Sequence, residues 1–130
     1  MSATSRVIVD LTTGGLIGMA TFQLLLAAGA PMGRAAFGGS ASVLALKRRI
    51  ASGVSALVFL VAAFIVLAHA GEFGDAKHFG WVRVGIWVLV ALFALSTVAN
   101  VASRSPWERF LMAPVGLLLT AGCFAVALNL

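Results

Sequence analysis

The chain has 130 residues, of which 62% are hydrophobic and only 10% are charged, and its formal net charge is +5. A soluble domain of this size needs more polar surface, so the composition predicts an integral membrane protein whose first partner is the lipid bilayer. No solvated basic face remains to hold nucleic acid, and the single cysteine, Cys123, excludes an internal disulfide.

Four apolar segments follow one another, each of about twenty residues and therefore long enough to cross a bilayer core of about 30 Å. We place the predicted helices at 7–30, 47–70, 82–102 and 106–128 of a single domain, 1–130. The turn between the last two segments is so short that these helices must run antiparallel. The predicted fold is an all-α, four-helix antiparallel transmembrane bundle.

The first segment carries Gln23, which is strongly polar among apolar neighbours. Within a membrane the amide of Gln23 needs a hydrogen-bond partner. The structural interpretation is a hydrogen bond to another helix, and the alternative is contact with a substrate. Asp10, near the start of the segment, is explained by pairing with Arg6 four residues earlier. Gly15 and Gly18 are small residues that would allow another helix to approach closely.

The connection at 29–42 combines glycines with apolar residues, which predicts an interfacial loop or, alternatively, a re-entrant loop lining a cavity. Lys47, Arg48 and Arg49 then begin the second helix at the membrane surface, where we expect them to contact lipid phosphate.

Metal-ligand residue types recur at every third position after the second segment, as His69, Glu72, Asp75 and His78. Glycines between them would break any helix that aligned them, so a solvated loop is the main interpretation and a metal site is a weak alternative. We therefore expect neither a metal nor a cofactor.

A polar strip of Ser96, Thr97 and Asn100 occupies the end of the third segment. Ser and Thr side chains can form hydrogen bonds to the backbone of their own helix. One interpretation is therefore a helix end whose polar side chains are hydrogen-bonded within the helix, and the other is a polar vestibule. The following S-P-W-E sequence, Ser105 to Glu108, predicts a helix start in which Ser105 is the cap and Glu108 completes a capping box.

The fourth segment has a seam of small residues at a 3-4-3-4 spacing, which predicts one closely packed face. The residues of this seam are Ala113, Gly116, Thr120, Cys123 and Ala127. Pro114 frees the carbonyl of Phe110, so a mild kink is expected there.

Orientation follows from the distribution of Lys and Arg, which favours the first and third connections on the cytoplasmic side. These connections hold Arg34, Lys47, Arg48, Arg49, Arg104 and Arg109, whereas the opposite side holds Arg6, Lys77 and Arg83. We therefore expect both termini outside, in a bacterial inner membrane.

Two motifs, G-A-P-M-G-R-A-A-F-G-G (Gly29–Gly39) and S-R-S-P-W-E-R (Ser103–Arg109), resemble a group of small four-span bacterial membrane proteins that has no assigned activity. The resemblance in layout covers nearly the whole chain. It implies the four-span architecture and adds no functional residues.

No set of residues typical of catalysis shares a plausible depth, and no charged residue falls in the middle of a predicted span. The leading hypothesis is a non-catalytic helix-bundle module that packs with itself, a partner protein or an apolar ligand such as a lipid. The alternative is a small oligomeric channel or transporter with a polar path at Gln23 and Ser96–Asn100. A membrane enzyme using the His69–His78 group is third.

Overall fold

The computed structural model describes residues 2–29 and 46–129, which form four long helices joined by short turns. The long helices are α1 (Ala3–Ala27), α2 (Leu46–His69), α3 (Gly80–Val101) and α4 (Ala113–Asn129). Among the described residues, four helical segments are long and apolar enough to cross a membrane: α1, α2, α3 and the segment Glu108–Leu128. The predicted all-α, four-helix architecture is therefore confirmed. The interfacial or re-entrant loop predicted at 29–42 lies almost entirely outside the described residues.

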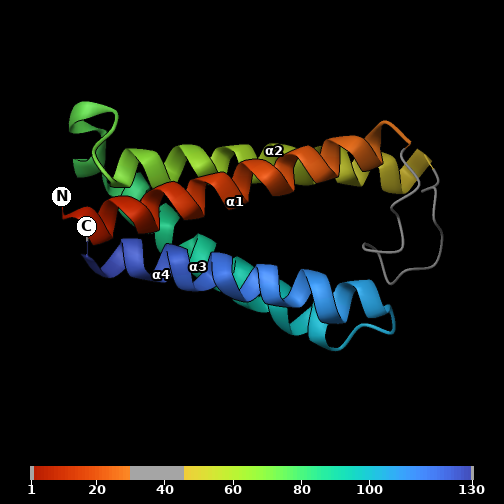
Figure 1. Ribbon diagram of the computed structural model, residues 1–130. Helices are drawn as coiled ribbons and strands as arrows, with labels where there is room; N and C mark the ends of the chain where they lie inside the picture. The colour runs from red at the N-terminus through yellow and green to blue at the C-terminus, as the bar shows by residue number, and fades with distance from the viewer. Residues whose placement is uncertain (1, 30–45, 130) are drawn as a thin grey trace.

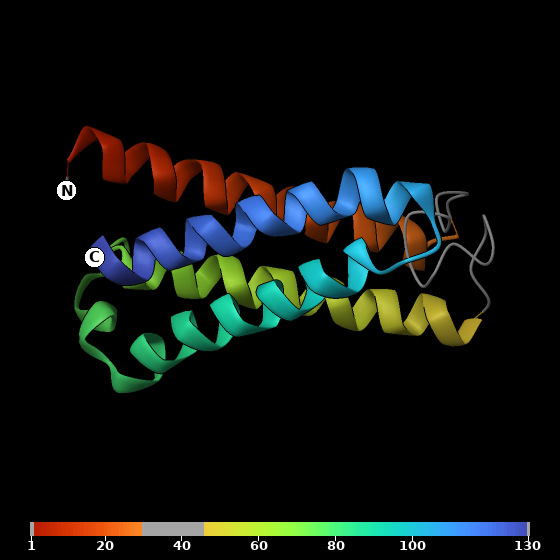
Figure 2. The ribbon, with the colours of Figure 1, turned by 90° about the horizontal axis from the view of Figure 1, so that it is seen from below.

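The bundle consists of two antiparallel pairs, α1 with α2 and α3 with α4, because most of the contacts between helices fall within these pairs. Both chain termini lie at the same end of the bundle (Figure 1). The turn between α3 and α4 lies at the opposite end, as the view from below also shows (Figure 2). In Figure 1 the two pairs lie close together near the termini and diverge toward this turn. We refer below to the terminal end and the turn end.

Helix boundaries differ by a few residues from those predicted, and backbone capping explains the differences. Helix α1 begins at Ala3 instead of residue 7, because the Ser2 hydroxyl accepts a hydrogen bond from the Ser5 N–H at 3.1 Å. It ends at Ala27, since Gly29 has a φ of 97°, the left-handed conformation that ends helices.

Between α2 and α3 the chain forms a short 3-10 helix, η3 (Gly74–His78), at the terminal end. Gly71 and Gly74 have φ values of 89° and 64°, so both occupy the left-handed region where a side chain would be strained. The two glycines thus end α2 and allow the chain to turn back into α3.

A π-helical turn, η4 (Glu108–Met112), precedes α4. The N–H of Ala113 donates to the carbonyl of Glu108, five residues earlier. Pro114 has no N–H and its ring would clash with the carbonyl of Phe110 in a regular helix, so the wider turn accommodates the proline. The irregularity expected near Pro114 therefore takes the form of a π-helical turn.

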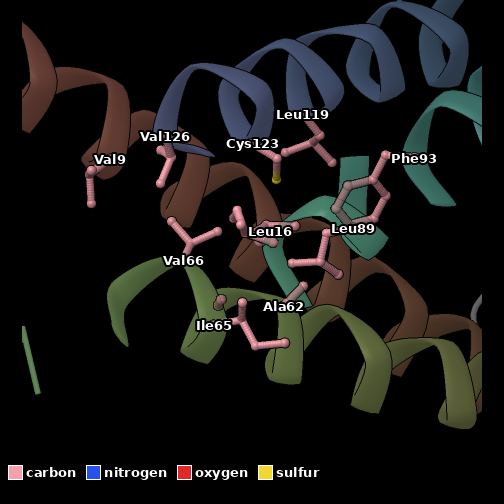
Figure 3. Packing of buried hydrophobic residues seen from close by; sticks show 12 residues of the cluster. Val9, Leu16, Ala62, Ile65, Val66, Leu89, Phe93, Leu119, Cys123 and Val126 are labelled. Atoms are coloured by element: carbon pink, nitrogen blue, oxygen red, sulfur yellow. The ribbon is translucent and has the colours of Figure 1, made fainter. Parts of the chain in front are cut away.

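The apolar core fills the bundle from its middle to the terminal end. Side chains from all four long helices meet there (Figure 3). The cluster comprises Val9, Leu16, Ala62, Ala63, Ile65, Val66, Ile86, Leu89, Phe93, Leu119, Cys123 and Val126. Large exposed apolar side chains, such as Leu11, Val84 and Leu118, cover the outside of the bundle, as expected for a surface in contact with lipid.

Glycines of α4 allow close approach both to α1, in the other pair, and to α3, in its own pair. A Cβ atom added at Gly122 would lie 2.2 Å from Oγ1 of Thr12 in α1. At Gly116 it would lie 2.6 Å from Oγ1 of Thr97 in α3. In lipid, where water does not drive helices together, such backbone approach is a main source of packing energy.

Candidate functional site

A cavity of about 180 Å³ lies between the helices, from the middle of the bundle toward the turn end. All four long helices and the π-helical turn η4 contribute to its wall. The lining residues are Met19, Phe22, Gln23, Ser55, Phe59, Phe93, Ser96, Asn100, Glu108, Met112, Gly116 and Leu119. Phe93 and Leu119 also belong to the apolar core, so the core closes this cavity on the side of the termini.

Three of the four polar residues selected from the sequence line this cavity: Gln23 of α1 and Ser96 and Asn100 of α3. The Oε1 atom of Gln23 is buried and has no hydrogen-bond partner among the described residues. The predicted bond from this amide to a neighbouring helix is therefore not formed at Oε1. An unsatisfied buried oxygen costs about 1–3 kcal/mol, and a ligand donor could remove that cost.

Thr97 does not line the cavity. Its hydroxyl donates to the carbonyl of Phe93 in its own helix at 2.7 Å, and its side chain packs against Gly116 of α4. Thr97 therefore matches the structural interpretation, a hydroxyl satisfied within its own helix, and it lies outside the polar wall.

The position of Glu108 in the cavity wall was not predicted from the sequence. Its side chain lines the cavity, and the residue is only 6% exposed. This glutamate lies near the start of the predicted span 106–128, in the first helical turn after the loop, and it faces inward. The spacing contained a signal, since Glu108, Met112, Gly116 and Leu119 are four, four and three residues apart and so share one helix face.

The backbone around Ser105 helps to hold Glu108 in place. The N–H of Ser105 donates to the hydroxyl of Ser103 at 3.1 Å, and its carbonyl accepts from the N–H of Arg109 at 3.0 Å. Ser105 is itself buried, with 5% exposure. Hydrogen bonds therefore join the residues on both sides of Glu108 in the α3–α4 turn.

Aromatic side chains form the apolar part of the wall. The rings of Phe59 and Phe93 are stacked, with centroids 5.8 Å apart and planes inclined by 8°. Phe22 of α1 and Met112 of η4 complete this part of the lining. The cavity thus combines one carboxylate and several neutral polar groups with an apolar wall formed mainly by phenylalanine and methionine side chains.

Basic residues gather at the turn end, outside the cavity. Lys47 and Arg48 are exposed at the start of α2, where contact with lipid phosphate stays a prediction. Arg49 is partly engaged within the protein, because its Nε donates to the carbonyl of Ala27 at 2.9 Å. Arg49 therefore caps the end of α1 and ties α1 to α2.

The weak metal candidates are dispersed. His69 is buried at the end of α2, whereas Asp75 and His78 are exposed on η3. Glu72, in the turn between α2 and η3, forms an ion pair with Arg6 of α1. Within residues 2–29 and 46–129, no three His, Cys, Asp or Glu side chains are grouped so that they could hold a metal ion. The predicted pairing of Arg6 with Asp10 is present at 3.7 Å.

The predicted packing residues face the interior to different degrees. Ala113 and Cys123 are buried, and Gly116, Thr120 and Ala127 are half-buried. A Cβ atom at Gly15 would lie 2.9 Å from Leu119, so this glycine serves a contact between α1 and α4. Gly18, by contrast, is exposed and has open space around it, so it makes no such contact within the chain.

The fold and the cavity define a class: a small α-helical protein whose four long helices are apolar enough to cross a membrane and line an open cavity with polar and apolar walls. No known protein family model, no curated protein and no solved structure matches this chain.

Proposed function

We propose that this protein is a small channel or transporter and that the cavity is the binding site for a small polar solute. The observation that carries the proposal is the meeting of Gln23, Asn100 and Glu108, from α1, α3 and η4, around one cavity inside the bundle. Polar and ionisable groups inside a membrane are costly to place, and they usually mark the path of a substrate or ion.

The uneven filling of the bundle supports the same proposal. The apolar core fills the terminal half, whereas the cavity lies toward the turn end. An arrangement of this kind fits a protein in which a solute enters from one side while the other side is closed. The basic residues of the turn end, which include Arg104 and Arg109, favour the cytoplasm as the side of entry.

The test is permeation of small solutes through proteoliposomes, followed by light scattering as the vesicles swell. Replacement of Gln23 by Leu removes an amide from the cavity wall, and we expect it to slow uptake about three- to tenfold, the equivalent of one neutral hydrogen bond. Thr21→Leu is the matched control, because Thr21 is exposed on the same helix and bonds back to the carbonyl of Ile17 at 2.9 Å.

The proposal fails if vesicles containing the protein are no more permeable than empty vesicles. It also fails if Gln23→Leu changes only the stability of the bundle and leaves uptake equal to that of Thr21→Leu. That second result would favour a packing role for Gln23.

A membrane module that binds lipid is the second candidate function, because an apolar groove of about 430 Å³ runs between α1 and α4. Its wall is formed by Ile8, Leu11, Thr12, Gly15, Val115, Leu118, Leu119 and Gly122. A groove of this chemistry suits an acyl chain. Mass spectrometry of the protein released from mild detergent would then detect a retained lipid, and its absence would count against this candidate.

A further inference from the structure

We infer that the cavity selects small organic cations that carry N–H donors, such as primary ammonium compounds. The inference rests on the proposed function and names the class of solute. It depends on three features of the wall, which are its charge, its hydrogen-bonding capacity and its apolar surface.

The charge comes from Glu108, the acidic residue in the lining. With 6% exposure, this carboxylate is largely shielded from water, where its attraction for a positive charge is stronger than at a surface. The basic residues of the turn end do not line the cavity. Arg109, for example, is exposed and lies over the ring of Phe110, with 5.3 Å from its Cζ to the ring centroid. Salt screens such exposed charges, so the buried carboxylate determines the preference of the interior.

The hydrogen-bonding groups of the wall favour a ligand that donates. Glu108 offers about four acceptor positions when ionised, so a bond it already makes leaves others for a ligand. The Oε1 atom of Gln23 is a buried acceptor that lacks a partner among the described residues. A primary ammonium group carries three donors and no acceptor, and therefore suits both side chains.

The apolar surface suits the rest of such a molecule. Phe22, Phe59 and Phe93 line the cavity, and aromatic faces attract cations within about 6 Å of the ring centroid. Met19 and Met112 add flexible surface for an alkyl chain. The volume of about 180 Å³ equals that of about six water molecules, so a solute of about six non-hydrogen atoms would fill it.

The experiment is isothermal titration of the full-length protein in lipid nanodiscs with four probes of similar size. These are n-butylammonium, tetramethylammonium, 1-butanol and butyrate. We expect n-butylammonium to bind most tightly, because tetramethylammonium lacks N–H donors, 1-butanol lacks the charge and butyrate carries the opposite charge.

The decisive variant is Glu108→Gln, which keeps the shape of the side chain and removes its charge. We expect it to weaken n-butylammonium binding about ten- to hundredfold, as for the loss of one charged hydrogen bond. Glu72→Gln is the matched control, since Glu72 pairs with Arg6 away from the cavity, and it should leave binding unchanged. If Glu108→Gln does not fold, Gln23→Leu should weaken n-butylammonium more than tetramethylammonium.

The possible failures are distinguishable. If the cavity takes up neutral solutes in a manner sensitive to Gln23→Leu, yet ammonium shows no advantage and Glu108→Gln has no effect, the cation inference is wrong and the proposed function stands. If tetramethylammonium binds as tightly as n-butylammonium, the requirement for N–H donors is wrong. If no probe binds and no solute permeates, the inference and the proposed function both fall.

Discussion

Replacement of Gly122 by Ala should weaken the contact between the two helix pairs. The added Cβ atom would lie 2.2 Å from Oγ1 of Thr12 and 3.2 Å from the Cβ and Cγ2 atoms of the same residue. Rotation of Thr12 about its Cα–Cβ bond can move Oγ1 and Cγ2, but it leaves the Thr12 Cβ atom in place, 3.2 Å from the added atom. The helices α1 and α4 must therefore move apart if the methyl group is to be accommodated.

Two opposing effects determine how much stability Gly122→Ala loses. Overpacking of a well-filled interior costs about 1–3 kcal/mol, and helix α4 gains about 1 kcal/mol when Ala replaces Gly. Gly18→Ala separates these effects, because Gly18 is helical and its added Cβ atom would meet nothing within 4 Å. We expect Gly122→Ala to be less stable than Gly18→Ala by about 1–3 kcal/mol.

The measurement is equilibrium unfolding in mixed micelles of increasing denaturing-detergent content, followed by circular dichroism. Thr12→Ala removes Oγ1 and Cγ2, so the double variant Thr12→Ala/Gly122→Ala should be more stable than the sum of the single effects by about 1 kcal/mol. The reasoning is refuted if Gly122→Ala is as stable as Gly18→Ala and the double variant is additive.

Arg49→Met should lower the free energy of unfolding by about 1.5–3 kcal/mol in the same assay, because it removes the hydrogen bond to the carbonyl of Ala27. Lys47→Met, at an exposed position, is the control and should have little effect. Equal losses of stability in the two variants would contradict the capping role of Arg49. Cys123, which is fully buried, should react with a water-soluble maleimide on the order of a hundredfold more slowly than a cysteine placed at exposed Ser2 in a Cys123→Ala background. Comparable rates would show that the bundle opens readily.

Local sequence signals were sufficient for the architecture. Segments of about twenty apolar residues predict membrane-length helices, and the short S-R-S-P-W turn requires α3 and α4 to be antiparallel. The starts and ends of helices were less predictable, because single capping residues decide them. Ser2 extends α1 by a turn at its beginning, and Gly29 ends it near Ala27.

The candidate site was predictable only in part. Gln23, Ser96 and Asn100 were selected because polar residues are rare in apolar segments, and the structure places all three around one cavity. Glu108 was assigned to a capping box because the S-x-x-E pattern already accounts for a glutamate at that position. The capping pattern does not say which side chains Glu108 faces, because that depends on how η4 packs against α3 and α4.

The same limitation applies to packing. The seam of small residues on α4 includes Gly116 and Cys123, yet the closest approach to α1 occurs at Gly122, outside the predicted seam. Spacing identifies which residues share a face of a helix. It does not identify the neighbour that this face meets, because partner choice depends on the mutual tilt of helices far apart in the chain.

The pairing of α1 with α2 and of α3 with α4 has a consequence for biosynthesis. Because most contacts lie within each pair, each hairpin is a natural unit of insertion, and the ribosome delivers α1 and α2 first. The cavity needs residues of both hairpins, so it does not exist until the second hairpin docks. Until then the amide of Gln23 faces lipid, whereas in the docked bundle it faces a cavity whose wall also holds Ser96, Asn100 and Glu108.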